Sequence, residues 1–132
     1  MLVHPFVPAV TAGELSMVFF GGEFNHAYRT VPAAGEVRAH PDFGGSIEPT
    51  DPSGPLRDQA RTVVATAGTV LGMDATTFVY ARVDGGEPEG AFELMELEMI
   101  DPSLGLSTSE GPVDRFAEAI DRRLNPSRVE GR

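Results

Sequence analysis

The sequence predicts an α+β fold, in which an antiparallel β-sheet has helices packed on one side. Two pairs of β-rich segments are each joined by a glycine-containing turn, which is typical of antiparallel hairpins. Two further segments place apolar residues at the three- and four-residue intervals of an amphipathic helix. Because the 132 residues are 41% hydrophobic, they can bury one core but hardly two, so we expect a single domain.

The first hairpin is predicted in ELSMVFFGGEFNHAYRTVP, residues 14–32, where Gly21 and Gly22 form a two-residue turn. Strict alternation along its second strand puts Asn25, Ala27 and Arg29 on one face. The opposite face then carries Phe24, His26 and Tyr28. Residues 32–55 hold much of the glycine and proline of the chain, so we expect a long irregular loop there, of a kind that tends to bind ligands.

A helix is predicted from Pro55 to Gly72, which suits a C-terminal stop. Its apolar positions at helical spacing are Leu56, Ala60, Val63, Val64, Ala67, Val70 and Leu71. Strands follow at about 76–84 and 91–100, joined by GGEPEG. A second helix, GPVDRFAEAIDRRL, has Pro112 in its first turn and a stripe of Phe116, Ile120 and Leu124. We assign residues 1–124 to the domain and 125–132 to a frayed tail, for which a vector-derived remnant is an alternative origin.

The composition excludes several classes of function. The 20 acidic and 10 basic residues give a net charge of −10, which repels a phosphate backbone, so we expect no nucleic-acid partner. All ten basic residues are arginine, which excludes lysine Schiff-base chemistry. The absence of cysteine excludes disulfides and thiolate zinc sites. No apolar run approaches the length of a membrane span and the first residues lack a signal-peptide pattern, so we expect a cytoplasmic protein without a membrane partner.

Charged residues interrupt the two later strands, which otherwise have the composition of a core. Side chains two apart on a strand share a face, so Arg82 and Asp84 form one row, and Leu94, Glu96 and Glu98 form another. If both rows face the same way, three carboxylates and one guanidinium meet on one patch. Carboxylates this close repel one another and a hard cation relieves the repulsion, which favours a magnesium site. The spacing alone also fits ordinary charges on the solvent face of an edge strand.

Several motifs occur in a fixed order: VHPFVP at 3–8, Glu14 in AGELSMVFF, NHAYRTVPAAGEVRAHPDFGG at 25–45, and ARVD followed by MELEMIDPS at 81–103. Together they resemble the C-terminal half of the ATP-grasp superfamily of carboxylate–amine ligases. The resembling branch contains prokaryotic glutathione synthetase, the ribosomal-S6 glutamate ligases and the cycloserine-forming ligase. The first motif is similar to the hinge of the family, and the last is similar to its R-x-D … E-x-N/E metal signature.

The resemblance implies roles in binding nucleotide, metal and phosphate. The hinge backbone would hydrogen-bond adenine and Glu14 would bind the ribose, which gives a nucleotide-binding set of His4, Pro5, Phe6, Val7 and Glu14. The catalytic residues would be Arg29, which holds the transferring phosphate, and Arg82, which lies near the γ-phosphoryl group. The magnesium ligands would be Asp84, Glu96 and Glu98.

The substrate-binding residues implied by the resemblance are Arg38, His40, Gly44, Gly45 and Ser103. A turn-forming serine after proline fits position 103 equally well. Many relatives have asparagine in place of Glu98 and an amide residue near His40, so the branch of the family and the two substrates stay open.

The function implied by the resemblance is that of the C-terminal portion of an ATP-dependent carboxylate–amine ligase. Such an enzyme uses ATP and Mg²⁺ to form an acyl phosphate from a small carboxylate and passes the acyl group to an amine. The phosphate-contacting lysines of its N-terminal lobe are absent here, so we expect the chain alone to be inactive. Expected partners are that missing lobe or, through the exposed lobe surface, a second copy of the chain. The alternative is a non-catalytic module that keeps the fold and binds nucleotide or a partner.

Overall fold

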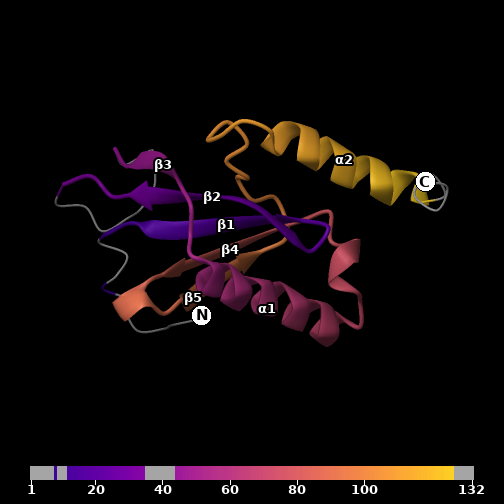
Figure 1. Cartoon of the computed structure of the whole chain (residues 1–132), viewed down its shortest axis with the longest axis horizontal. Helices are drawn as coiled ribbons and strands as arrows, with labels where there is room; N and C mark the ends of the chain where they lie inside the picture. The colour runs from indigo at the N-terminus through magenta and orange to yellow at the C-terminus, as the bar shows by residue number, and fades with distance from the viewer. Residues whose placement is uncertain (1–7, 9–11, 35–43, 127–132) are drawn as a thin grey trace.

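The computed structural model describes residues 8, 12–34 and 44–126. Five strands form one antiparallel sheet in the order β3-β2-β1-β4-β5 (Figure 1). Their bounds are β1 Glu14–Phe20, β2 Glu23–Val31, β3 Ser46–Thr50, β4 Tyr80–Gly86 and β5 Glu93–Glu98. The helices are α1 Gly54–Leu71 and α2 Pro112–Leu124, with short 3-10 turns at Ala75–Thr77 and Pro88–Gly90. The predicted α+β class with an antiparallel sheet is confirmed.

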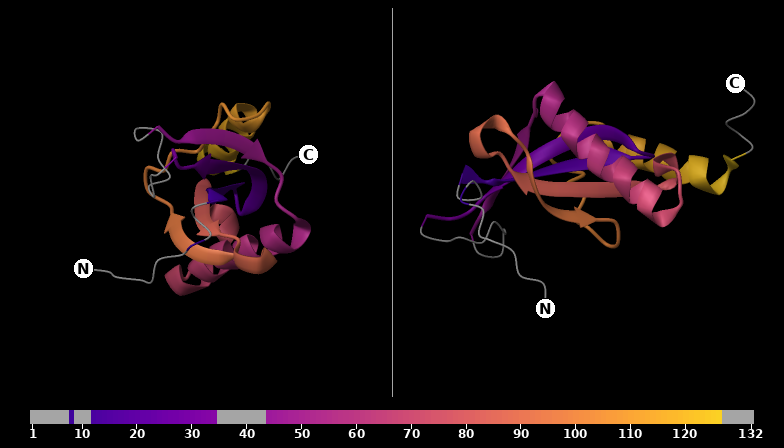
Figure 2. Two further views of the ribbon diagram at one scale, coloured as in Figure 1. Left: turned by 90° about the vertical axis from the view of Figure 1, so that its left-hand side faces the viewer. Right: turned by 90° about the horizontal axis from the view of Figure 1, so that it is seen from below.

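The two helices lie on opposite faces of the sheet, whereas the sequence led us to expect both on one side (Figure 2). One core packs Leu15, Met17 and Phe19 of β1 against Ala60 and Val64 of α1. A second core packs the alternate β1 residues and α2, and its buried members are Val18, Phe20, Tyr28 and Ala119. The reason is that β1 is apolar on both faces at its C-terminal end, so each face needs a cover.

Two irregularities in the pairing break the strict alternation predicted from the sequence. The register between β1 and β2 shifts between Val18 and Phe19, and Phe24 therefore packs edge-on against Phe19 on the α1 face. The register between β4 and β5 shifts between Asp84 and Gly85. Because this shift adds a residue to β5, Leu94 lies beside α1 and does not share a row with the two glutamates that follow it.

The loop predicted over residues 32–55 contains one strand that the sequence reasoning missed. Strand β3 pairs only with β2, at the edge of the sheet. Pro49 lies within it, and an edge strand tolerates proline because one of its sides needs no backbone donor. A five-residue strand with little apolar content gives almost no periodic signal.

The helices begin and end close to the predicted positions, but their apolar stripes are only partly buried. Gly72 ends α1 in the left-handed conformation, with φ of 64°. Val70 near the end of α1 is 78% exposed and Leu124 at the end of α2 is 72% exposed. In Figure 1 the C-terminal end of α2 runs beyond the strands. Asn125 caps α2, and the rest of the predicted tail, from 127 on, lies outside the described residues. Within the described part of the chain, no helix has the length and apolar character needed to cross a membrane.

Candidate functional site

A polar cavity opens on the face of the sheet that α2 covers only in part. Helix α2 packs over one end of this face, where Phe116 stacks on Phe20 and meets Tyr80 edge-on. Towards the other end lies a cavity of about 430 Å³. Its lining residues come from all five strands and the segment after β5, and they are Glu14, Ser16, Tyr28, Thr30, Ile47, Arg82, Glu96, Glu98, Asp101 and Ser103.

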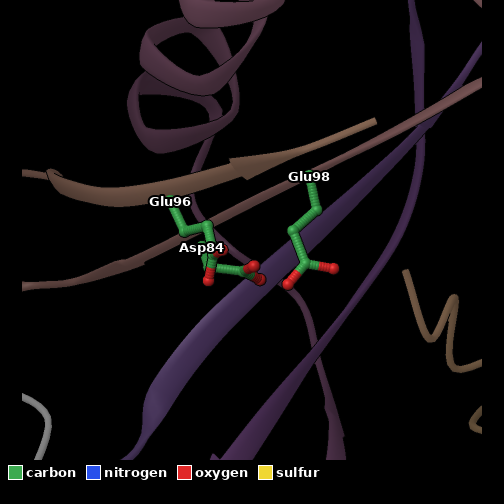
Figure 3. Close-up of side chains that lie close together, drawn as sticks. All are labelled: Asp84, Glu96 and Glu98. Atoms are coloured by element: carbon green, nitrogen blue, oxygen red, sulfur yellow. The ribbon is translucent and has the colours of Figure 1, made fainter. Parts of the chain in front are cut away.

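Three carboxylates meet at this cavity. In the ladder between β4 and β5, Asp84 pairs with Glu96 and Arg82 pairs with Glu98, which places all four side chains on one face. One carboxylate oxygen from each acid lies within 4.8 Å of the others, and Figure 3 shows the three groups directed toward one another. Asp84 is the deepest, with 1% of its surface exposed. The structure therefore brings together the three predicted metal ligands.

Arg82 is held among these acids by a set of directed contacts. Its Nε donates to both oxygens of Asp84, at 2.9 and 3.0 Å. Its two terminal nitrogens reach the Ser103 carbonyl oxygen at 2.8 Å and a Glu98 oxygen at 3.0 Å. A guanidinium has five N–H groups, so these contacts leave about two of them available to a ligand. Predicted residues Arg82 and Ser103 thus meet, the latter through its backbone.

Glu14 lies on the same face and is electrostatically coupled to the cluster. It neighbours Thr30 in the ladder between β1 and β2, and among the described residues its carboxylate accepts no hydrogen bond. Burial, followed by repulsion from Asp84 and the two glutamates, raises the pKa of Glu14 to about 7, against an opposing effect of Arg82. This predicted ribose-binding residue is therefore at the cavity, with a carboxyl group that readily takes up a proton near neutral pH.

The charge of the cavity is strongly unbalanced. Four acids line it, Glu14, Glu96, Glu98 and Asp101, and buried Asp84 lies next to two of them, whereas Arg82 is the single cationic side chain among its described lining residues. Burial raises the pKa of Glu98 as well; Arg82 opposes this effect and the neighbouring acids add to it. Such a cluster favours cation binding or proton uptake.

The segment after β5 is fixed to the sheet by residues that the sequence reasoning did not assign to a site. The Tyr28 hydroxyl donates to the Ser103 carbonyl oxygen at 2.9 Å, and His26 Nε2 lies 2.8 Å from the Leu104 carbonyl oxygen. Tyr28 and Ser103 are 75 positions apart. The alternation of side chains along β2 places Tyr28 on the cavity face once β1 and β2 are in register. No signal in the sequence, however, predicts that its hydroxyl contacts the Ser103 carbonyl.

The structure does not bring Arg29 into the cavity. Arg29 pairs with Leu15, so its side chain projects on the opposite face, between cavity residues Tyr28 and Thr30. There it donates to the Gly13 carbonyl oxygen at 3.0 Å and forms an ion pair with Glu87. The physical reason is the two-residue period of the strand, which directs Arg29 away from the face that carries Tyr28 and Thr30. Its predicted role at the transferring phosphate stays a prediction.

The remaining predicted residues lie apart from the cavity or outside the described chain. Gly44 and Gly45 precede β3, and neither lines the described cavity. The predicted residues His4, Pro5, Phe6, Val7, Arg38 and His40 lie outside the described residues. Their nucleotide- and substrate-binding roles stay predictions.

Comparisons with known proteins support the fold and the family. No model of a known protein family matches the chain. The cycloserine biosynthesis protein DcsG of Streptomyces lavendulae is 30% identical over 129 residues, covering 96% of this chain and 43% of that protein. Glutathione synthetase of Bradyrhizobium diazoefficiens is 31% identical over 85 residues, covering 64% of this chain and 26% of that protein.

Comparison with solved structures supports the same fold. The crystal structure of D-cycloserine synthetase DcsG superposes with a TM-score of 0.72 at 30% identity, over 92% of this chain and 41% of that one. D-alanine–D-alanine ligase from Bacillus anthracis, solved in complex with ATP, gives a TM-score of 0.56 at 18% identity, over 90% and 40%. The second likeness shows a shared fold alone.

The five-stranded antiparallel sheet with its two helices matches the C-terminal lobe of an ATP-grasp domain. The chain belongs to the ATP-grasp superfamily of ligases and corresponds to the C-terminal part of that domain. It spans less than half the length of the curated relatives that it matches.

Proposed function

We propose that this chain is the metal- and phosphate-binding lobe of an ATP-dependent carboxylate–amine ligase. The observation that carries the proposal is the meeting of Asp84, Glu96 and Glu98 with Arg82 beside one cavity, on a lobe whose relatives include a cycloserine biosynthesis protein and a glutathione synthetase. The acids supply hard oxygen ligands and the arginine supplies a fixed fork of donors for phosphate oxygens.

The donor set fits Mg²⁺. Two oxygens bound to one Mg²⁺ lie at most about 4 Å apart, so oxygens within 4.8 Å can share one ion after a small inward shift, or hold a pair of ions or bridging waters. Asp84, Glu96 and Glu98 would hold the metal, and Glu14 lies close enough to raise the local negative charge further. When bound, Mg²⁺ neutralises the β- and γ-phosphates of ATP.

Arg82 would stabilise charge on the transferring phosphoryl group with its two remaining N–H groups. Because Asp84, Glu98 and the Ser103 carbonyl fix the guanidinium, it needs little reorganisation when that charge develops. A carboxylate oxygen of the substrate attacks the γ-phosphorus, and the bond to the β-phosphate oxygen breaks, giving an acyl phosphate and ADP. The amine nitrogen then attacks the acyl carbon, phosphate leaves, and the nitrogen loses a proton. No side-chain nucleophile is needed.

Other contacts belong to the proposal through family likeness. Glu14 would bind the ribose, the backbone around His4–Val7 would bind adenine, and Ser103 would lie beside the acceptor amine. Arg29 does not line this cavity, so Arg82 is the arginine that would contact the phosphoryl group there. Phosphates clamped from one side alone would not reach in-line geometry, so turnover would need the N-terminal lobe of the ligase.

The test is Mg²⁺-dependent ADP binding by the chain, which calorimetry measures with and without chelator. We expect weak binding that disappears with chelator and in Glu96→Gln, and that survives in Glu93→Gln, an exposed glutamate of the same strand. Binding that is unaffected by chelator or by Glu96→Gln would overturn the metal assignment.

A second measurement separates an enzyme part from a binder. We expect phosphate release when the chain is combined with a separately expressed N-terminal lobe, together with a carboxylate and an amine substrate. Mg²⁺-dependent ADP binding without any turnover in that mixture would instead favour the non-catalytic module.

A further inference from the structure

The carbonyl oxygen of Ser103 is shared by two donors from different strands. Tyr28 of β2 donates its hydroxyl at 2.9 Å, and Arg82 of β4 donates a terminal N–H at 2.8 Å. A carbonyl oxygen only accepts, so the Tyr28 hydroxyl must carry its proton to make this contact. Burial raises the pKa of Tyr28 above its usual range, which keeps that donor present.

Further contacts hold the segment that carries this carbonyl against the sheet. The next carbonyl, that of Leu104, receives a hydrogen bond from His26 Nε2, because a carbonyl can only be the acceptor. Gly105 has φ of 57° and lies against the Tyr28 ring, and a methyl group at this position would overlap that ring. Thr108 then donates to the Gly105 carbonyl oxygen at 2.7 Å. The segment thus rests on Tyr28 from one side and is tied to it through Ser103.

We propose that Tyr28 is a positioning residue that fixes the Ser103 carbonyl and, through it, the direction of the Arg82 guanidinium at the acidic cavity. For what Arg82 does chemically, the inference rests on the proposed function. Tyr28 itself acts through Ser103, because its hydroxyl is already donated to that carbonyl.

The geometry explains why a third anchor matters. Asp84 and Glu98 are also the acids that would hold metal, so cation binding weakens their hold on the guanidinium. The Ser103 carbonyl is the one neutral acceptor among the three described anchors, so it keeps its contact whatever the cation content of the cavity. A rigid Ser103 carbonyl therefore holds Arg82 in place when the carboxylates turn toward a cation.

The test needs no nucleotide. The Arg82 Nε–H signal in a ¹H–¹⁵N spectrum can be identified by its loss in Arg82→Lys, and its hydrogen exchange measured. We expect Tyr28→Phe to speed that exchange roughly fivefold, the factor that corresponds to one lost hydrogen bond of ordinary strength. Tyr80→Phe is the matched control, since among the described residues the Tyr80 hydroxyl makes no hydrogen bond. Equal exchange in Tyr28→Phe and the parent would overturn the inference.

A second variant disturbs the contact between Tyr28 and the Ser103 carbonyl without removing the Tyr28 hydroxyl. Gly105→Ala should displace the Tyr28 ring and also speed the Arg82 Nε–H exchange. Its control is Gly72→Ala, where φ is 64° and no atom lies within 4 Å of the added methyl group. Both alanines carry similar backbone strain, so a change in Gly105→Ala alone supports the inference. If the Arg82 Nε–H exchanged equally slowly in Gly105→Ala and Gly72→Ala, the inference would be overturned. This comparison also decides the matter if Tyr28→Phe folds poorly.

ADP binding separates this inference from the proposed function. With Mg²⁺ present, we expect Tyr28→Phe to weaken ADP binding several-fold, and Tyr80→Phe to leave it unchanged. Absence of ADP binding in every variant, together with faster Arg82 exchange in Tyr28→Phe, would overturn the proposed function and uphold the positioning role. Normal ADP binding by Tyr28→Phe together with unchanged Arg82 exchange would uphold the proposed function and overturn the positioning role.

Discussion

The two faces of the sheet differ in kind although the same strands build both. On the α1 face, Leu15 and Met17 of β1 and Val83 of β4 are fully buried in an apolar core. On the other face, their chain neighbours Ser16 and Asp84 meet charged groups at an open cavity. Alternation lets one residue stabilise the fold while the next is free for chemistry.

This comparison also explains how the cavity tolerates five acids around one arginine. Like charges destabilise a folded chain, and stability must then come from elsewhere. The α1 core supplies it, because Val83 and Leu97, which alternate with these acids along β4 and β5, pack into that core on the opposite face. Changes on the α1 face should therefore lower stability, and changes on the cavity face should alter ligand binding.

The largest expected effect is on the α1 face. Leu15→Ala should lower the free energy of unfolding by about 2–5 kcal/mol, because it removes a fully buried side chain and leaves a void. Urea unfolding followed by circular dichroism measures it. Leu94→Ala, at a half-exposed leucine of β5, is the control and should cost much less. Equal losses in the two variants would contradict the assignment of the core.

The next effect is on the cavity face and concerns turnover. In a reconstituted ligase, Arg82→Lys should lower the rate about 100-fold or more, because a lysine ammonium cannot reproduce the planar fork that meets Asp84, Glu98 and a phosphate together. Arg61→Lys, at an exposed arginine of α1, is the control and should leave turnover unchanged. Turnover of the lysine variant within a few-fold of the parent would reduce Arg82 to a structural ion pair.

Much of this arrangement could be predicted from the sequence, because its signals are local. The turn at Gly21 and Gly22, the stop at Gly72 and the shared face of Glu96 and Glu98 all follow from backbone preference or strand period. These rules fail where a strand carries an extra residue. The register shift beside Gly85 places Leu94 on the α1 face, and the hydrophobic pattern of the sequence did not predict this shift.

Long-range contacts could not be predicted for a different reason. The side on which α2 packs depends on the path of the segment after β5, which the Ser103 and Leu104 carbonyls fix through Tyr28 and His26. These pairs are more than 70 positions apart and involve backbone acceptors, which every residue has. The face of Arg29, by contrast, follows from the strand period alone, which places it opposite Tyr28, as predicted.

A smaller effect is expected on the stability of the cavity face itself. Without metal, Glu96→Gln should leave the fold intact and raise the free energy of unfolding by up to about 1 kcal/mol, because it removes one charge from a repulsive cluster. Glu93→Gln should change it little. Thermal unfolding at low salt measures both. A clear loss of stability in Glu96→Gln alone would mean that the carboxylates are stabilising each other through Arg82 rather than repelling.

The smallest expected effect is a pH dependence that belongs to Glu14. Its pKa is about 7 in the folded chain and near 4.5 when exposed, so between these values the unfolded chain has lost a proton that the folded chain still holds. The stabilisation by this proton is complete below pH 4.5 and is lost as the pH rises to and past 7. Glu14→Gln should therefore flatten the fall in unfolding free energy between pH 5 and 8, and Glu23→Gln should not. Mg²⁺ added to the parent at pH 8 should restore part of the lost stability, because a cation replaces the proton in relieving the repulsion from Asp84 and its neighbours. If the parent and Glu14→Gln showed the same slope in a urea titration series, the Glu14 carboxyl would not be coupled to the cluster, and the cavity face would be less strained than its geometry indicates.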